Sequence, residues 1–117
     1  MLDLSVHKIF TKDLNKAQLN PTNSAKLFLY ISLLLNNEEL PQEARDHFLS
    51  GEWKDTKEFH ISGDLLVIYM IDDNTLQLLR IGTHSQLFKW IFYFFLIFHI
   101  ILYIDILEKR NGKIFKN

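Results

Sequence analysis

One hydrophobic run limits the folds open to this chain more than any other feature. Residues 65–71 read Leu-Leu-Val-Ile-Tyr-Met-Ile, which is seven consecutive apolar residues. A run of this length, rich in β-branched residues and followed by turn residues, is typical of a buried strand. The turn Asp72-Asp73-Asn74 comes next, and a second apolar stretch extends from Leu76 to Ile81. The pattern therefore predicts a β-hairpin inside a sheet.

Weaker patterns place other elements around this hairpin. Apolar and polar residues alternate over residues 2–6, which predicts a first strand, and residues 53–61 predict another. Residues 7–19 and 24–35 carry apolar side chains at helical spacing, with a break at residues 20–23 and Ser24 as the expected N-cap. The order β-α-α-β-β-β predicts an α+β fold in which two N-terminal helices pack on an antiparallel sheet.

The chain is short and contains no cysteine. Its 117 residues favour one globular domain, and 48% hydrophobic residues argue against intrinsic disorder. The lack of cysteine excludes disulfides, thiolate nucleophiles and cysteine-based zinc sites. Asp3 and the polar run Thr11-Lys12-Asp13 interrupt any apolar signal-peptide core. We therefore expect a cytoplasmic protein.

The C-terminal residues differ from the rest in charge and hydropathy. Residues 1–88 contain eight basic and twelve acidic residues, a net charge of −4, whereas residues 89–117 have a net charge of +3. Residues 90–107 are apolar apart from His99 and Asp105, which predicts a hydrophobic helix. The sequence thus divides into a domain at residues 1–88 and an extension at residues 89–117.

Three interpretations of this extension stay open. A stretch of 18 residues with an Asp near one end is borderline for crossing a membrane, so residues 90–107 could contact a membrane. A shorter buried helix, packed on the sheet or in an oligomer interface, is the second interpretation. The third is accidental translation past a lost stop codon. Residues with AT-rich codons (Ile, Phe, Lys, Asn, Tyr) make up 20 of the last 29 positions but only 25 of the first 88.

Three of the five histidines lie at the ends of predicted elements: His47, His60 and His84. Cleavage of RNA without a metal needs a base for the ribose 2′-OH, an acid for the departing 5′-oxygen and a cation for the phosphorane. Histidines together with Asp64 and Arg80 meet those needs, because histidine titrates near neutrality. The same residue types also suit a zinc site with Asp64 as the fourth ligand, or a binding module without catalysis.

Three segments add a family resemblance. Residues 46–54 (DHFLSGEWK) resemble the "DHxLxGxWK" segment of YafQ-like toxins of the RelE/ParE superfamily. Residues 60–69 (HISGDLLVIY) are similar to the "HxxxDxLLIY" segment, and residues 78–88 (LLRIGTHSQLF) to the terminal "LxRxGTHxxLF" segment. The three occur in order and at the family's spacing. The resemblance covers residues 1–88 and implies a RelE-like fold.

The resemblance also implies roles for individual residues. His84 would be the leading general acid or base, with His47 and His60 assisting proton transfer and substrate positioning. Asp64 would orient a histidine or act as a base. Arg80 would stabilise the phosphorane, unless it only neutralises a nearby acid, and Phe88 would stack on a base, unless it closes the core. We expect further substrate contacts from basic residues, namely Arg45, Lys54 and Lys57, and no metal or other cofactor.

These expectations lead to one main hypothesis and one alternative. The main hypothesis is the toxin of a type II toxin–antitoxin system, a ribosome-dependent endoribonuclease that cleaves mRNA in the A site and is held by a cognate antitoxin. The alternative is a catalytically inactive protein of this fold that binds an antitoxin or DNA, with its tail as a membrane anchor. Lys57, which replaces a frequent arginine of the family pattern, and the acidic body motivate the alternative.

Overall fold

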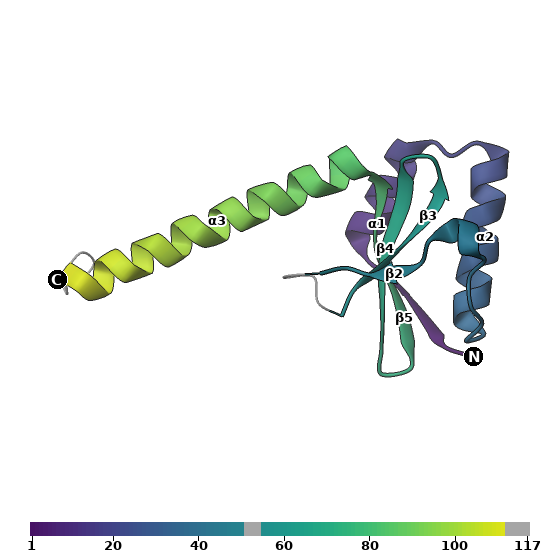
Figure 1. Cartoon of the computed structure of the whole chain (residues 1–117), viewed down its shortest axis with the longest axis horizontal. Coiled ribbons are helices and arrows are strands. Elements are labelled where there is room, and N and C mark those ends of the chain that lie inside the picture. Colours follow the sequence, from purple (N-terminus) through teal and green to yellow (C-terminus); the bar gives the residue numbers. More distant parts are fainter. Residues whose placement is uncertain (51–54, 112–117) are drawn as a thin grey trace. The chain divides into compact units, whose positions relative to one another are not determined.

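The computed structural model describes residues 1–50 and 55–111, except for the side chains of residues 88–95 and 111. Two compact units divide the chain, Met1–His84 and Ser85–Asn117, and each is described by itself. The elements in chain order are β1 (Asp3–Val6), α1 (Lys8–Ala17), α2 (Pro21–Leu35), a short 3-10 helix η1 (Gln42–Ala44), β2 (His47–Phe48), β3 (Lys57–Ser62), β4 (Leu65–Asp72), β5 (Thr75–Thr83) and α3 (His84–Asn111) (Figure 1).

The predicted hairpin is confirmed as β4 and β5, which pair antiparallel with Asp72 opposite Thr75. Its two-residue loop places Asp73 and Asn74 at φ 49° and 59°. Positive φ at both loop positions matches the right-handed twist of the strands, and Asp and Asn tolerate it better than most residues. The five strands lie in the order β1-β5-β4-β3-β2 (Figure 1).

The sheet is mixed, so the prediction of a wholly antiparallel sheet was wrong at one edge. Strand β1 pairs parallel to β5, with Leu4 opposite Leu76 and Val6 opposite Leu78. Parallel neighbours need a long crossover connection, and the chain between β1 and β5 supplies one through α1 and α2. The α+β class with two N-terminal helices is confirmed.

The two helices are set by caps and apolar faces. Pro21 is the first residue of α2, and the Asn20 side chain accepts a hydrogen bond of 2.8 Å from the backbone N–H of Asn23. The helix therefore begins before Ser24, because proline suits the first helical position, where no N–H is needed. Its residues Leu27, Tyr30 and Leu34 are buried, and Phe10 of α1 joins them in the core.

Strand alternation gives the two faces of the sheet different chemistry. Phe59 and Ile61 of β3 point into the core, where Phe59 contacts Tyr30 edge-on at a ring distance of 5.6 Å. Glu58 and His60, the intervening residues, point to the opposite face and are nonetheless buried. Because successive strand residues alternate between faces, one strand supplies both core and candidate site.

The second unit contains the predicted hydrophobic helix, residues 90–107, as part of α3. Side chains at residues 96–106 are exposed, including the large apolar residues Ile97, Phe98 and Ile101. Lys109 pairs with Asp105 at 3.3 Å, one turn away. Within the described residues, no helix combines the length and the apolar content that crossing a membrane requires.

Candidate active site

The three histidines at predicted element ends meet on one face of the sheet. His47 is on β2, His60 is on β3, and His84 directly follows β5 as the first residue of α3. The rings of His47 and His60 are stacked with centroids 6.4 Å apart, and those of His60 and His84 are 5.3 Å apart. Residues separated by up to 37 positions thus form one cluster, as their shared candidate role requires.

Glu58 lies at the centre of this cluster, although the sequence reasoning did not select it. Its Oε1 is 3.0 Å from Nε2 of His47 and 3.6 Å from Nε2 of His60. The side chain of Glu58 is only 7% exposed. The signal in the sequence was its spacing, because a residue two positions before His60 on a strand must share the face of His60.

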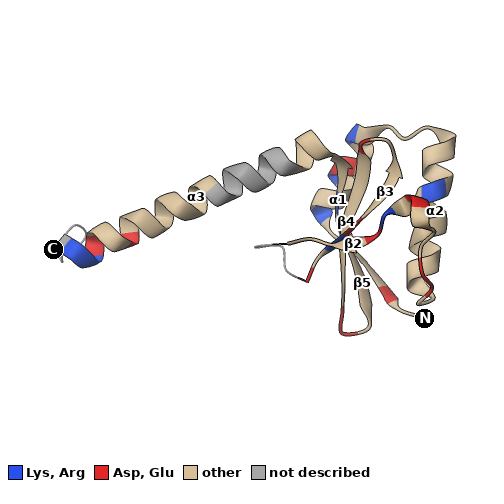
Figure 2. Cartoon of the chain, in the orientation of Figure 1, with Lys and Arg blue, Asp and Glu red and all other residues tan. Residues whose placement is uncertain are grey.

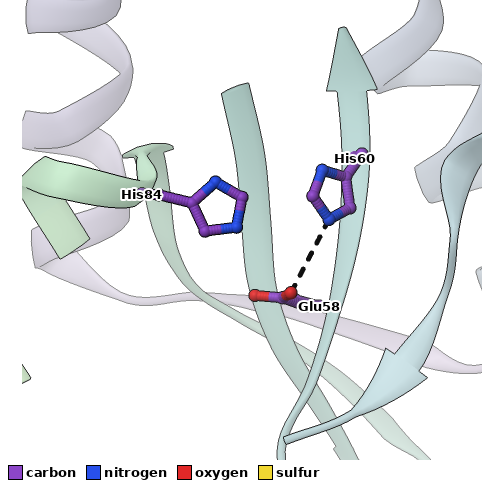
Figure 3. A group of neighbouring side chains, drawn as sticks. All are labelled: Glu58, His60 and His84. Carbon is purple, nitrogen blue, oxygen red and sulfur yellow. Dashed lines mark ion pairs between the residues drawn. The ribbon is translucent and has the colours of Figure 1, made fainter. Parts of the chain in front are cut away.

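Asp64 holds His84 in one orientation. The Asp64 Oδ1 accepts from the His84 ring at Nδ1, 2.6 Å away, and from the His84 backbone N–H at 3.3 Å. A carboxylate only accepts, so Nδ1 carries the proton and Nε2 is the acceptor nitrogen of the neutral ring. The ring of His84 faces Glu58 and His60 (Figure 3). The predicted orienting role of Asp64 agrees with this geometry.

His47 shares a proton with Glu58. Its Nδ1 lies 2.6 Å from the backbone oxygen of Arg45. Since a carbonyl only accepts, Nδ1 must donate, and the 3.0 Å contact between Nε2 and Glu58 then needs a second proton. That proton resides either on His47, as an ion pair, or on the carboxyl group of Glu58. The pair is therefore suited to exchange a proton with a substrate.

His60 is the buried, neutral member of the cluster. Burial lowers the pKa of His60, and the charge of Arg45 lowers it further, while Glu58 acts in the opposite direction. Among the described residues, its Nδ1 is a buried nitrogen without a hydrogen-bond partner. An unpartnered acceptor costs less than an unpartnered donor, which favours the tautomer with its proton on Nε2, facing Glu58.

Arg80 is bound by an acid from α1. Its Nε and one terminal nitrogen contact the two carboxylate oxygens of Asp13 at 2.7 and 3.1 Å. The same carboxylate accepts from the backbone N–H of Ile81 at 3.2 Å, beyond the part of β5 that pairs with β1. A bidentate pair uses two of the five N–H groups of arginine. Arg80 is thus held rigidly, and Asp13, which the sequence reasoning passed over, holds it.

The other predicted cations have different positions. Arg45 is exposed and close enough to His60 for its charge to lower the pKa of that histidine. Lys57 alternates with Glu58, so its side chain points to the other face, where it pairs with Asp46 at 3.0 Å. This placement argues against the predicted substrate contact of Lys57. Lys54 and the side chain of Phe88 lie outside the described residues.

The cluster could also hold a metal ion. Glu58, His60 and His84 each offer one ligand atom, and these atoms lie within 4.8 Å of one another (Figure 3). Two imidazoles and a carboxylate suit zinc or copper. The grouping differs from the zinc alternative drawn from the sequence, because Glu58 takes the place that Asp64 would have had. Asp64 instead supports His84 from behind, as outer partners of metal-bound histidines do.

Comparison with known proteins agrees with the fold and the three sequence segments. Residues 2–89 match the family described as a bacterial toxin of type II toxin–antitoxin systems, YafQ. The chain belongs to the YafQ toxin family. The mRNA interferase toxin YafQ of Escherichia coli K12 is 36% identical over 87 residues, which cover 74% of this chain and 95% of the relative. The family match ends near the start of the hydrophobic stretch, at residue 89.

Solved toxin structures share the fold. A copper-bound mutant toxin from Helicobacter pylori is 40% identical with a TM-score of 0.70, and the match covers 74% of this chain and 99% of the toxin. YafQ in the Escherichia coli DinJ–YafQ complex is 35% identical with a TM-score of 0.68, covering 75% of this chain and 99% of that one. The fold is therefore shared with a copper-bound toxin and with YafQ in its DinJ complex.

Proposed function

We propose that this chain is the toxin of a type II toxin–antitoxin system and an endoribonuclease that cleaves mRNA without a metal. The observation that carries the proposal is the cluster of a buried carboxylate, Glu58, with three histidines, one of which is oriented by Asp64. Acid–base cleavage of RNA needs two groups that exchange protons on opposite sides of a phosphate. Membership of a family that includes an mRNA interferase supports the same activity.

Glu58 and His84 suit the two proton transfers. In the first, the Glu58 carboxylate takes the proton of the ribose 2′-OH while the 2′-oxygen attacks the phosphorus. In the second, Nε2 of protonated His84 gives its proton to the 5′-oxygen as the P–O5′ bond breaks. The products are a 2′,3′-cyclic phosphate and a free 5′-OH, and water then exchanges the two protons. Asp64 keeps Nδ1 of His84 protonated, which leaves Nε2 for this step.

The remaining groups support the charge changes. His47 donates to Glu58 and offers positive charge when protonated, whereas Nε2 of neutral His60 lies 3.6 Å from Glu58, beyond hydrogen-bond distance. Arg45 and Arg80 are the proposed cations for the phosphorane, and Lys54 and Phe88 stay predicted contacts to the substrate. Figure 2 shows acidic and basic residues interspersed over the unit Met1–His84, so the approach of RNA depends on such local cations.

We also propose the ribosome as the place of action and an antitoxin as the partner. An acidic body weakens the attraction between free RNA and the protein, so mRNA presented in the A site is the favoured substrate. The DinJ–YafQ complex of the Escherichia coli relative supports a cognate antitoxin for this chain. Both expectations place the working protein in the cytoplasm.

The test is cleavage of a defined mRNA by the full chain, with and without ribosomes. We expect cuts that need ribosomes, leave a 2′,3′-cyclic phosphate, and disappear with His84→Ala. The chelator 1,10-phenanthroline removes transition metals but leaves the magnesium that ribosomes require, and we expect cleavage to continue in it. Intact mRNA with wild-type protein and ribosomes would refute the enzymatic proposal and favour an inactive protein that binds an antitoxin or DNA.

A second role is proposed for the tail, namely contact with a membrane through residues 90–107. Its support is the exposed apolar surface of residues 96–106, followed by Lys109 and Arg110, which suit anionic lipid headgroups. Charged residues in the described part of α3 gather at its C-terminal end (Figure 2). Fractionation of the full chain and of residues 1–88 is the test. The proposal requires the full chain, but not the truncated one, to sediment with membranes.

A further inference from the structure

We propose that Asp46 is a positioning residue, which holds His47 against Glu58 from the opposite face of the sheet. Asp46 precedes His47 in the sequence, but its side chain lies on the other face of the sheet from the histidine cluster. It rests on the proposed ribonuclease activity, because His47 belongs to that site. Its contacts are all among residues of the unit Met1–His84.

Backbone pairing alone fixes His47 weakly. Strand β2 has only two residues, which pair with β3 as His47 opposite Glu58 and Phe48 opposite Lys57. One further backbone bond, Leu49 N–H to the Thr56 oxygen at 2.9 Å, follows it. Before β2, Arg45 adopts a left-handed conformation with φ 47°, which a residue with a side chain adopts at a cost. A short, strained edge of this kind needs side-chain support to stay in one place.

Asp46 provides that support through two contacts. Its Oδ1 accepts from the hydroxyl of Tyr69 at 2.5 Å, and its Oδ2 accepts from Nζ of Lys57 at 3.0 Å. The Asp46 side chain is 18% exposed, and Tyr69 is fully buried in the core. Burial, together with the hydrogen bond to Asp46, raises the pKa of Tyr69 far above its usual value. The phenol therefore keeps its proton and donates at every physiological pH.

The contacts tie three strands together at one point. Lys57 and Tyr69 are paired residues on β3 and β4, and Asp46 joins both from the segment that leads into β2. The Lys57 ammonium also lies 5.0 Å above the ring of Phe48, the other residue of β2. Hydrogen bonds to charged groups are stronger and more directional than neutral ones. Asp46 is thus anchored to the middle of the sheet.

The anchor acts on His47 because neighbouring residues of an extended strand point to opposite faces. The Asp46 side chain lies on the side of Lys57 and Tyr69, and His47 lies on the side of Glu58. Releasing Asp46 would let the short strand rotate and lengthen the 3.0 Å contact between His47 and Glu58. The role also accounts for Lys57, which serves Asp46 on this face rather than RNA on the other.

The first experiment is a double-mutant cycle on mRNA cleavage with the full chain. We expect Asp46→Asn to lower cleavage about 10- to 100-fold, the range seen for residues that orient catalytic groups. In a His47→Ala background, Asp46→Asn should change cleavage by less than about twofold, because the effect passes through His47. Additive losses, or full activity of Asp46→Asn, would overturn the proposal.

Two further variants separate positioning from folding. Tyr69→Phe removes one hydrogen bond but keeps the carboxylate, so it serves as the test if Asp46→Asn does not fold. It should lower cleavage by a smaller factor than the one expected for Asp46→Asn. Tyr30→Phe is the matched control, since Tyr30 is also buried and donates to an acid, Glu43, at 3.1 Å. It should cost similar stability in urea unfolding while leaving cleavage unchanged. Equal losses of cleavage in both tyrosine variants would reduce Asp46 to a structural role.

An NMR measurement stands apart from the activity. We expect the ring signals of His47 to change in Asp46→Asn and to stay unchanged in Tyr30→Phe. If the wild type cleaves no RNA but this shift occurs, the proposed function fails while the positioning of His47 by Asp46 holds. If the His47 signals are the same in both variants, the positioning proposal fails whatever the enzyme does.

Discussion

Two carboxylates in this protein pair with histidine, and their surroundings differ sharply. Glu58 lies inside the sheet with a side chain that is 7% exposed, and it contacts His47 and His60. Asp64 lies in the turn between β3 and β4 with a side chain that is 58% exposed, and its Oδ1 contacts the ring of His84. Residue type is nearly the same in both pairs. The exposure of the carboxylate is what separates them.

This difference in exposure suits the two carboxylates to different roles in the same cluster. Water and salt screen an exposed pair, so Asp64 contributes direction more than energy. The buried carboxylate of Glu58 lies between two imidazoles, 3.0 Å from His47 and 3.6 Å from His60, where water and salt screen it little. Glu58 is therefore suited to exchange a proton with the substrate, whereas Asp64 is suited to aim His84. The predictions below test this division from the largest effect to the smallest.

The largest effect is expected when either proton carrier is replaced. Glu58→Gln keeps the shape of the side chain and His84→Gln keeps a polar one, and both remove the ability to exchange protons. Each should lower single-turnover cleavage of ribosome-bound mRNA by about 10²- to 10⁴-fold, the range for general acid–base groups. Wild-type cleavage by Glu58→Gln would show that Glu58 takes no part in the mechanism, and would contradict the different roles of Glu58 and Asp64.

Asp64→Asn should have a smaller effect, about 10- to 100-fold, because it misorients His84 without removing it. The asparagine can present its amide to Nδ1 and stabilise the wrong tautomer. Asp72→Asn is the control, an exposed aspartate in a strand end, and it should cleave as the wild type does.

Copper binding tests which carboxylate can be a metal ligand together with His60 and His84. Glu58, rather than Asp64, shares the 4.8 Å grouping with His60 and His84, so saturating Cu²⁺ should stop cleavage by occupying the proton carriers. Titration calorimetry should show at least about tenfold weaker Cu²⁺ binding in Glu58→Gln and a smaller loss in Asp64→Asn. The reverse ranking would mean that Asp64 is the ligand.

The smallest effect concerns stability against pH. Burial lowers the pKa of His60 below its ordinary value of 6.5. Well above pH 6.5, this residue is therefore neutral in the folded protein and in the unfolded chain. As the pH falls below 6.5, the unfolded chain binds a proton that the folded protein takes up only at lower pH. Unfolding therefore becomes easier in that window. Urea unfolding from pH 7.5 to 5 should show this decline, and His60→Gln should reduce its slope.

Several parts of the fold were open to prediction from particular residues. The apolar run at residues 65–71 and the loop Asp73-Asn74 identified the hairpin, because each pattern favours one backbone conformation, a buried strand and a two-residue turn. The parallel pairing of β1 did not follow, since alternation in a short strand carries no information about its neighbour. Ser24 failed as a cap because Asn20 and Pro21, just before it, make a better helix start.

The sequence predicted the histidines of the candidate site but not the acidic residues beside them. His47, His60 and His84 stood out by residue type, and their ordered segments tied them to a family. Glu58, Asp13 and Asp46 were missed, because acidic residues are common on surfaces and only their partners mark them. Arg80 was selected as a cation for substrate, yet the side chain that binds it, Asp13, comes from a helix 67 positions away.

The sequence by itself determined the family of this protein, the central hairpin and the histidines, because these depend on local patterns and on residue type. Tertiary structure alone decided which carboxylate is buried among those histidines and which is exposed beside one of them. It also decided that Lys57 faces Asp46 rather than the cluster. The physical reason is that burial and charge pairing depend on which strands become neighbours, and local sequence does not encode that.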